Sequence, residues 1–437
     1  MTTAQTAVLR TELPRSGAIG DVLLAGGVRS VFQPIVHLDT GAVAAYEALA
    51  RGPVGPLETP DALFAAARRA GLLAELDGAC RVAAFQGASR LGLVAPHTVF
   101  VNVGPEVLDC APLSDLLAIA DAAPGELRVV LEITERALAS RPAELLRTVE
   151  RVRDLGWGVA LDDVGADAAS LAFMALLRPD VVKLDLSLVQ NRPTAATAEI
   201  MHAVNAYAEL SGALVLAEGI ENERHLESAR ALGATLGQGW LFGSPTAHPD
   251  PDLPAHALDL AAGRGAANRT TPGSPFACLP DDVVLKRSSK RLLIELSKHL
   301  EREAMRLGDT CVVASTFQHG RHFTPATAQR YRDLVAATGF VCALGEDLPE
   351  EPVPGLRGAR LSSDDPVRGE WDVVILSPHF STAMLARDLG DTGPDLDRTF
   401  EYALTYRRGT VIEAAHQLLS RVVPRLSAAG PAAPAGR

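Results

Sequence analysis

The sequence is poor in cysteine and aromatic residues and has no long uncharged apolar run. Its five cysteines are far apart and form no CxxC pair, which argues against a disulfide framework or a thiolate zinc site and favours reduced thiols: Cys80, Cys110, Cys278, Cys311 and Cys342. No run of about 18 apolar residues predicts a membrane span, and the first fifteen residues have no apolar segment of the signal-peptide type. We therefore expect a cytoplasmic protein without a membrane span.

Basic residues are also scarce relative to acidic ones. The chain has 41 Lys and Arg against 53 Asp and Glu, a formal net charge of -12. Because phosphate backbones are bound by clustered Lys and Arg, we expect neither DNA nor RNA as a partner. With 437 residues, 47% of them hydrophobic, the chain is long enough for two domains with their own cores.

The first part of the chain alternates strand-like and helix-like segments. Strands are expected at 31–38, 42–50, 97–103, 126–134, 158–163, 180–189, 213–220 and 235–243, and helices at 60–71, 75–91, 141–156 and 194–212. The strands are too apolar to face water on one side, which indicates a parallel sheet covered by helices. Their number and spacing favour a (β/α)8 barrel. The tight turn Asp39-Thr40-Gly41 predicts an antiparallel pair at the start.

The composition changes after residue 246, where Pro, Gly, Ala and polar residues dominate. We expect an N-terminal extension (1–27), a barrel (28–250), a linker (251–282), a smaller α/β domain (283–423) and a disordered tail (424–437). In the second domain we expect a helix over 284–308, strands at 311–317, 339–345 and 371–377, and a segment at 399–423 that is helical at both ends.

Acids, amides and one lysine stand at the expected strand ends: Glu47, Asn102, Glu132, Glu135, Asp162, Asp163, Lys183, Asp185, Glu218, Glu221 and Gln238. Singly, such residues are usually helix caps or loop residues. In a barrel they would all meet at the mouth that carries active sites. One lysine does not neutralise so many carboxylates, whereas Mg²⁺ or Mn²⁺ takes these oxygen ligands. The adjacent Asp162–Asp163 pair suits two metal ions, with one carboxylate bridging them.

At this point the chain resembles the EAL-type cyclic di-GMP phosphodiesterases over residues 28–248. The resemblance rests on Glu47-Ala48-Leu49 and on the order of the motifs QPIV, NVGPEVL, LEITE, LDDVG, KLD, AEGIE and GQGWLFGSP. It implies a TIM-like (β/α)8 barrel with one antiparallel strand and two bound Mg²⁺ or Mn²⁺ ions. It also implies hydrolysis of cyclic di-GMP to linear pGpG.

The resemblance also implies roles for individual residues. The first metal ion would be held by Glu47, Asn102, Glu132 and Asp162, and the second by Asp162, Asp163 and Glu218. Lys183 would position or help to deprotonate the attacking water, Gln238 would support metal-bound solvent, and Glu135 would brace the loop after the fifth strand. The substrate side would include Gln33, Leu49, Arg51, Asp185 and Glu221.

One loop and one single position depart from the family pattern. The loop after the Asp pair reads Val-Gly-Ala-Asp-Ala-Ala-Ser (164–170) in place of Phe-Gly-Thr-Gly-Tyr-Ser-Ser, and Gly52 stands where an aromatic residue often follows Arg51. In the family this loop helps to set the second metal and a contact of the homodimer. Two further hypotheses therefore stay open beside the enzyme: a receptor that binds cyclic di-GMP with little hydrolysis, and an interaction scaffold without metal dependence.

Residues 284–422 resemble the DICT sensory domain, most clearly over 364–389. The resemblance implies a regulatory input whose ligand or partner protein is unknown. His319 and His322 form an HxxH pattern without an obvious third metal ligand, so we interpret them as surface or capping residues. We interpret His379, which follows Pro378, as structural.

Overall fold

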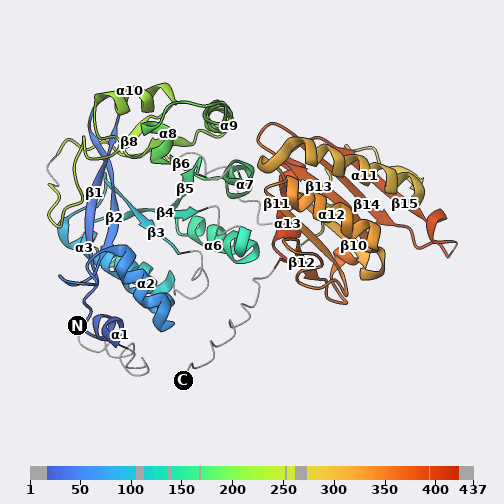
Figure 1. Ribbon diagram of the computed structural model, residues 1–437, viewed down its shortest axis with the longest axis horizontal. Helices are drawn as coiled ribbons and strands as arrows, with labels where there is room; N and C mark the ends of the chain where they lie inside the picture. Colours follow the sequence, from blue (N-terminus) through green and yellow to red (C-terminus); the bar gives the residue numbers. More distant parts are fainter. Residues whose placement is uncertain are drawn as a thin grey trace, which may run out of the picture. The chain divides into compact units, whose positions relative to one another are not determined.

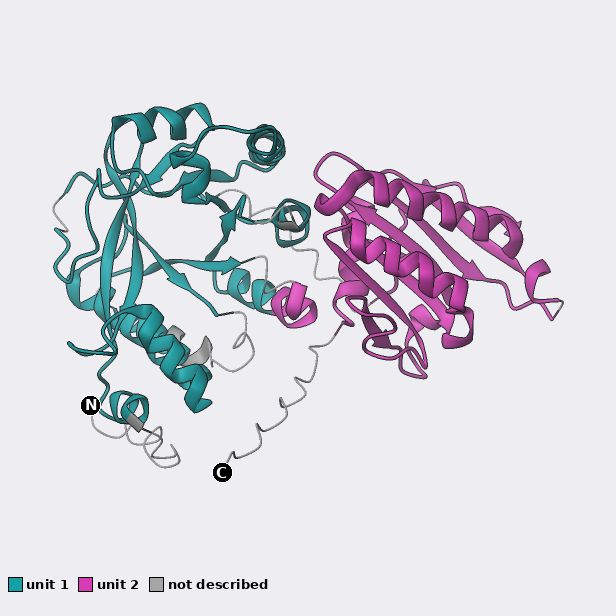
Figure 2. Cartoon of the chain, in the orientation of Figure 1, with its two compact units in different colours: residues 1–135, 148–268 teal, residues 136–147, 269–437 magenta. Residues whose placement is uncertain are grey.

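The computed structural model describes residues 17–104, 113–123, 125–134, 139–166, 169–250, 253–260, 273–392 and 394–422. The chain divides into two compact units (Figure 2). Unit 1 comprises residues 1–135 and 148–268, and unit 2 comprises residues 136–147 and 269–437. The expected tail at 424–437 and most of the expected N-terminal extension lie outside the described residues.

Unit 1 is built on a closed barrel of eight strands that follow one another in chain order (Figure 1). They are β1 (Arg29–His37), β2 (Val43–Arg51), β3 (Thr98–Asn102), β4 (Arg128–Thr134), β5 (Gly158–Val164), β6 (Val181–Leu184), β7 (Leu214–Ala217) and β8 (Leu236–Gln238). β1 runs antiparallel to both of its neighbours, β2 and β8, and all other neighbouring pairs are parallel. The TIM-like barrel with one antiparallel strand is thereby confirmed.

The helices of this part of the chain are α1 (Gly17–Leu24), α2 (Pro60–Ala70), α3 (Leu73–Leu91), α4 (Leu113–Asp121), α6 (Pro142–Asp154), α7 (Ala169–Leu177), α8 (Leu186–Gln190), α9 (Ala195–Ser211) and α10 (Glu223–Ala231). Glycines end two of them. Gly71 and Gly212 close α2 and α9 in the left-handed conformation, with φ of 68° and 75°. β6 is shorter than expected because Asp185 caps α8, accepting a hydrogen bond from the Ser187 amide at 2.9 Å.

The chain after β8 returns to the amino-terminal end of the barrel. Val43 N donates to Pro254 O at 2.8 Å, and Arg128 Nη2 donates to Leu258 O at 2.8 Å. The Leu258 side chain is 2% exposed and packs among the buried residues of the strands, including Ala44, Val130 and Ala160. Residues 254–258 therefore bind to the barrel, with Leu258 in its core, and do not form part of a linker as expected over 251–282.

We expect Leu258→Ala to lower the free energy of unfolding of the barrel by about 2–4 kcal/mol, because it leaves a cavity among close-packed side chains. Leu253→Ala is the matched control, since Leu253 is 42% exposed and its truncation leaves no cavity. Chemical denaturation of the full chain, followed through the transition of the barrel, measures both. Equal stability of the two variants would contradict the assignment of Leu258 to the core.

Unit 2 contains a seven-stranded sheet in the order β12-β11-β10-β13-β14-β15-β9. The strands are β9 (Lys286–Ser289), β10 (Val312–His319), β11 (Phe340–Glu346), β12 (Arg357–Arg360), β13 (Glu370–Leu376), β14 (Ser381–Asp388) and β15 (Thr399–Thr405), and the helices are α11 (Lys290–Leu307), α12 (Pro325–Ala337) and α13 (Arg408–Leu419). β10, β11 and β12 are parallel, and the remaining neighbours are antiparallel. The second α/β domain is confirmed.

Three local expectations for this unit were wrong. Residues 399–405 form β15 in place of a helix, β14 was not foreseen, and the expected helix at 284–308 begins only at Lys290, after β9. β14 pairs with β13 on one side and β15 on the other, and β15 pairs with β9. β9 and β15 owe their conformation to pairing between segments far apart in the sequence, which local periodicity does not record. Short 3-10 turns complete the unit at Phe276–Cys278, Gly308–Thr310, Gly320–His322, Pro366–Gly369 and Asp395–Asp397.

The described cysteines, Cys80, Cys278, Cys311 and Cys342, are free thiols, as expected. Cys110 lies outside the described residues. Among the helices that the structure describes, none combines the length and the apolar character that crossing a membrane requires.

Candidate metal and catalytic site

Lys183 is the centre of a cluster of carboxylates at the carboxyl ends of the barrel strands. Its side chain, on β6, is 1% exposed. Lys183 Nζ lies 2.6 Å from Glu132 Oε1, 2.7 Å from Glu218 Oε1, 3.0 Å from Asp162 Oδ1 and 3.9 Å from Glu47 Oε1. The four acids come from β2, β4, β5 and the residue after β7, so the parallel strands bring together groups that are far apart in the sequence.

A set of amide hydrogen bonds fixes the carboxylate of Glu47. Gln238 Nε2 donates to Glu47 Oε2 at 2.6 Å and to Gln33 Oε1 at 3.1 Å, and Asn102 Nδ2 donates to Glu47 Oε1 at 3.0 Å. Gln33 and Glu47 face each other in the register of β1 and β2. The reversed strand β1 thus contributes directly to the site.

The adjacent acids of β5 reach the same region through an irregularity in the strand. The pairing of β5 with β6 changes register between Leu161 and Val164, and Asp163 adopts the left-handed conformation with φ of 54°. In a regular strand, neighbouring side chains point to opposite faces. Here oxygens of Asp162, Asp163 and Glu218 lie within 4.8 Å of one another, a group that fits a metal ion.

Burial and charge together perturb the pKa values of this cluster. Burial would lower the pKa of Lys183, but the surrounding carboxylates, Asp162 foremost, raise it well above its usual value. Burial and the charge of Glu47 raise the pKa of Glu132 well above its usual value. Burial raises the pKa of Glu218 to about 7, with a further contribution from Asp162. The one ammonium does not offset all the acids.

Glu47 behaves differently from the other glutamates. Burial would raise its pKa, but the charge of Lys183, followed by hydrogen bonds that include those from Gln238 and Asn102, leaves the pKa lowered. Glu47 is therefore an ionised carboxylate held in one orientation, as a metal ligand must be.

Buried oxygens without a hydrogen-bond donor support the fit to a cation. Within the described part of the chain, Glu132 Oε2 and Gln238 Oε1 are buried and accept no hydrogen bond. Such atoms are unfavourable in a protein interior unless something compensates them. Carboxylate and amide oxygens are the donors that Mg²⁺ and Mn²⁺ prefer. The residues at this mouth therefore fit divalent cations.

Four other predicted substrate residues, which the structure describes, have different contacts or positions. Leu49 and Arg51 are partly buried at the end of β2, where Arg51 Nη1 donates to Ala50 O at 2.8 Å. Asp185 caps α8. Glu221 is exposed, and its backbone amide donates to His225 Nδ1 at 3.3 Å. Glu135 lies outside the described residues, and the roles of all five stay predictions.

The structure explains one of the two departures from the family pattern. A Cβ atom at position 52 would lie 2.0 Å from Leu57 O, because the chain after β2 folds back on itself. Gly52 is therefore required by the backbone, and a stacking side chain has no room there. In the loop after the Asp pair, Asp167 and Ala168 lie outside the described residues, whereas a Cβ at Gly165 (φ of 105°) would lie 2.5 Å from Leu188.

A buried ion pair on α3 was missed from the sequence. Asp77 and Arg81 are each 3% exposed and bind each other, and Asp77 Oδ1 accepts a hydrogen bond from Gly104 N at 3.0 Å. Gly104 follows Asn102 by two residues, so the pair supports the segment that carries this amide. The only signal in the sequence is an acid and an arginine four residues apart within one predicted helix.

The fold and the cluster define a TIM-like barrel with a candidate divalent-metal site at the carboxyl ends of its strands. The model of the EAL domain matches residues 17–245, and the chain belongs to the EAL domain family. The model named "Sensory domain in DIguanylate Cyclases and Two-component system" (DICT) matches residues 280–389.

Similar proteins include three with curated names. The cyclic di-GMP phosphodiesterase NbdA of Pseudomonas aeruginosa is 32% identical over 52% of this chain and 29% of its own length. The cyclic di-GMP phosphodiesterase RocR of the same organism is 30% identical over 58% of this chain and 64% of its own. The probable cyclic di-GMP phosphodiesterase PdeB of Escherichia coli is 30% identical over 48% of this chain and 41% of its own. The matches thus span less than two thirds of each relative.

Among solved structures, the chain is similar to the calcium and cyclic di-GMP complex of BlrP1 from Klebsiella pneumoniae. The identity is 28% and the TM-score 0.46, over 50% of this chain and 56% of that chain. The manganese and cyclic di-GMP complex of BlrP1 at pH 6 gives 27% identity and a TM-score of 0.46, over 53% of this chain and 57% of that chain.

Proposed function

We propose that the barrel hydrolyses one phosphodiester bond of cyclic di-GMP to give linear pGpG. The observation that carries the proposal is the convergence of Glu47, Glu132, Asp162 and Glu218 on Lys183, beside the bulge that adds Asp163. Relatives about 30% identical to the chain are named cyclic di-GMP phosphodiesterases. This donor set suits a phosphodiester, whose cleavage needs charge neutralisation.

For the cation ligands we propose the two sets that the family resemblance implies. Glu47, Asn102, Glu132 and Asp162 would hold one Mg²⁺ or Mn²⁺ ion, and Asp162, Asp163 and Glu218 a second. Bound there, the two ions would neutralise the phosphodiester and activate water. Gln238 and Asn102 keep the Glu47 carboxylate in one orientation through their hydrogen bonds.

Lys183 supplies a fixed positive charge to the same site. Its ammonium contacts three acids at 3.0 Å or less, so it orders their carboxylates and can donate a hydrogen bond to a phosphate oxygen or to the attacking water. Because the carboxylates raise its pKa, Lys183 holds its proton firmly in this arrangement. Proton acceptance by Lys183 stays a prediction that depends on repulsion from bound cations. We further propose that Gln33, Leu49 and Arg51 contact the dinucleotide.

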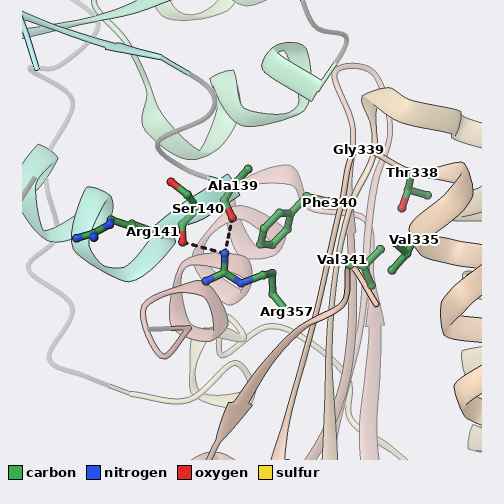
Figure 3. Close-up of a pocket in the computed structure, with 10 residues that line it drawn as sticks. Ala139, Ser140, Arg141, Val335, Thr338, Gly339, Phe340, Val341 and Arg357 are labelled. Atoms are coloured by element: carbon green, nitrogen blue, oxygen red, sulfur yellow. Dashed lines mark hydrogen bonds between the residues drawn. The ribbon is translucent and has the colours of Figure 1, made fainter. Parts of the chain in front are cut away.

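We also propose that unit 2 regulates the barrel. Residues 136–147, which begin two residues after β4 and so follow Glu132 closely in the chain, belong to unit 2. In that unit Arg357 Nη1 donates to Ala139 O and to Ser140 O, both at 2.8 Å, beside Phe340 (Figure 3). Arg357 is 7% exposed, which favours a lasting contact. A change in unit 2 would act on the segment that follows a proposed metal ligand.

The test is to incubate the purified protein with cyclic di-GMP and Mn²⁺ and to follow pGpG by chromatography. We expect pGpG to form with Mn²⁺ or Mg²⁺ and to be absent when EDTA is in excess. Tight binding of cyclic di-GMP without pGpG at any Mn²⁺ concentration would favour the receptor, which the altered loop at 164–170 supports. The scaffold hypothesis predicts neither hydrolysis nor a metal requirement.

A further inference from the structure

Unit 2 has a hollow at the carboxyl ends of two parallel strands, distant in sequence from the residues of the barrel site. β10 and β11 end at His319 and Glu346, which face each other in register. In open α/β sheets, ligands bind outside the carboxyl ends of the strands. The hollow has a volume of about 370 Å³, which is within the range of small-molecule sites, and its lining combines charged, aromatic and proline residues.

His319 is held at the rim of the hollow by a carboxylate. His319 Nδ1 and Glu346 Oε2 are 2.6 Å apart, and Arg368 binds the other oxygen of Glu346. The hydrogen bond from Arg368, reinforced by the one to His319, lowers the pKa of Glu346, which therefore remains a carboxylate. Because Glu346 accepts the Nδ1 proton, the ring of His319 is held in one orientation; its Nε2 atom accepts a hydrogen bond in the neutral ring and donates one in the imidazolium. This histidine of the HxxH pattern is 40% exposed, as expected for a surface residue, and is also bound by Glu346.

Arg321 supplies an unpaired positive charge to the same hollow. Its side chain is exposed and forms no hydrogen bond or ion pair within the part of the chain that the structure describes. Its neighbour His322 adds no charge near neutral pH, because burial and the charge of Lys290 lower its pKa to about 4. Arg321 is therefore the group in this lining that is best suited to bind an anion.

Another part of the lining of the hollow is apolar and rigid. The ring of Phe323 packs edge-on against Phe317 and Tyr331, with centroid distances of 5.2 and 5.6 Å, so its position is fixed. Leu348, which is 2% exposed, lies beside Pro349 and Pro352 in the same lining. Rings and prolines have few rotatable bonds, so this wall is preorganised for a flat partner.

The backbone around the hollow is also unusual. Asp347 has φ of 60°, a left-handed conformation that is costly for a residue other than glycine and occurs often at functional sites. Opposite to it, a Cβ atom at Gly320 would approach Asp347 O to 3.2 Å and Glu346 O to 3.3 Å. The two loops therefore lie close together, and the shape of the hollow is set before any ligand arrives.

We propose that this hollow binds a small monoanionic aromatic or heteroaromatic carboxylate. Its carboxylate would lie on Arg321, and its ring on Phe323 and the neighbouring prolines. Asp347, which also lines the hollow, disfavours ligands with two or more negative charges, such as phosphate esters. The proposal concerns unit 2 alone and does not depend on the proposed chemistry of the barrel.

Isothermal titration of the purified full-length protein with benzoate and with indole-3-acetate tests the proposal. We expect a Kd below about 1 mM for at least one of them. Benzyl alcohol, cyclohexanecarboxylate and phenyl phosphate serve as controls that lack the charge, the flat ring or the single negative charge, and each should bind at least about tenfold more weakly than the better carboxylate. Failure of both carboxylates to bind at about 10 mM, or equal binding of phenyl phosphate, would overturn the proposal.

Matched variants locate the binding. Arg321→Gln should weaken binding of the better carboxylate at least about tenfold, whereas Arg332→Gln, on the exposed surface of α12, should leave it unchanged. Phe323→Leu should weaken it through loss of the ring contact while leaving charge untouched. Arg321 is exposed, so its replacement does not endanger folding. Unchanged affinity in Arg321→Gln would show that the ligand binds elsewhere and would contradict the assignment of the hollow as its site. This outcome does not depend on whether the barrel forms pGpG.

Discussion

Replacing Lys183 with methionine is expected to abolish pGpG formation and to destabilise the barrel in the absence of divalent cations. Lys183 is 1% exposed and contacts Glu132, Asp162 and Glu218 at 3.0 Å or less. Removing one member of a buried charge cluster leaves its partners uncompensated, a loss of about 3–5 kcal/mol. The rate of hydrolysis should fall at least ~10³-fold, because the site loses its fixed positive charge.

The same variant should respond to metal more strongly than the wild type does. Mn²⁺ would replace part of the missing positive charge, so the rise in Tm that Mn²⁺ causes should be larger in Lys183→Met than in the wild type. Lys298→Met is the control, because Lys298 is 38% exposed and its ion pair with Glu295 lies at the surface. Thermal unfolding with EDTA and with Mn²⁺ measures both. Similar melting of Lys183→Met and Lys298→Met in EDTA would show that the carboxylates need no cation.

The grouping of acids at the strand ends was predictable because it depends only on topology. Once the segments are recognised as parallel barrel strands, Glu47, Glu132, Asp162 and Glu218 must meet at one mouth, and Lys183 with them. The same reasoning does not give distances or charge states. The raised pKa of Lys183 results from how deeply the cluster is buried, which the sequence does not reveal.

Features that depend on contacts in three dimensions could not be predicted from the sequence. From the sequence, Gly52 was interpreted as the loss of an aromatic residue. In the structure, the carbonyl of Leu57 leaves no space for a Cβ atom at this position. β14 and β15 form because each is paired on both sides, although neither has the strong apolar run of β13. Leu258 lies in a segment with linker-like composition, yet its side chain is buried in the barrel.

For the Asp162–Asp163 pair, too, the sequence predicted the chemistry but not the geometry. The sequence indicated that two adjacent acids at a strand end suit two cations, with one acid bridging. It did not indicate how neighbouring residues in a strand bring both carboxylates to one side. The structure supplies this through the register change after Leu161 and the left-handed backbone of Asp163.

That backbone makes Asp163→Asn the variant that best separates an enzyme from a receptor. Asparagine tolerates the left-handed conformation about as well as aspartate, so the substitution removes the charge without straining φ. The oxygens of Asp162 and Glu218 remain, so one cation should bind more weakly while the other is retained. Affinity for cyclic di-GMP in Ca²⁺ should stay within about tenfold of wild type, roughly 1.4 kcal/mol.

Hydrolysis by Asp163→Asn should fall far more than binding, by on the order of 10²-fold or about 2.7 kcal/mol of barrier, because activation of water needs both cations. Wild type in Ca²⁺ should resemble the variant, since Ca²⁺ coordinates more loosely than Mg²⁺ or Mn²⁺. Calorimetric affinity in Ca²⁺ and pGpG release in Mn²⁺ are measured for both proteins, with Asp61→Asn as a control that neutralises an exposed acid in the first turn of α2. Wild-type hydrolysis in Asp163→Asn would show that the bulge of β5 serves the fold alone and that one cation at Glu47 and Glu132 suffices.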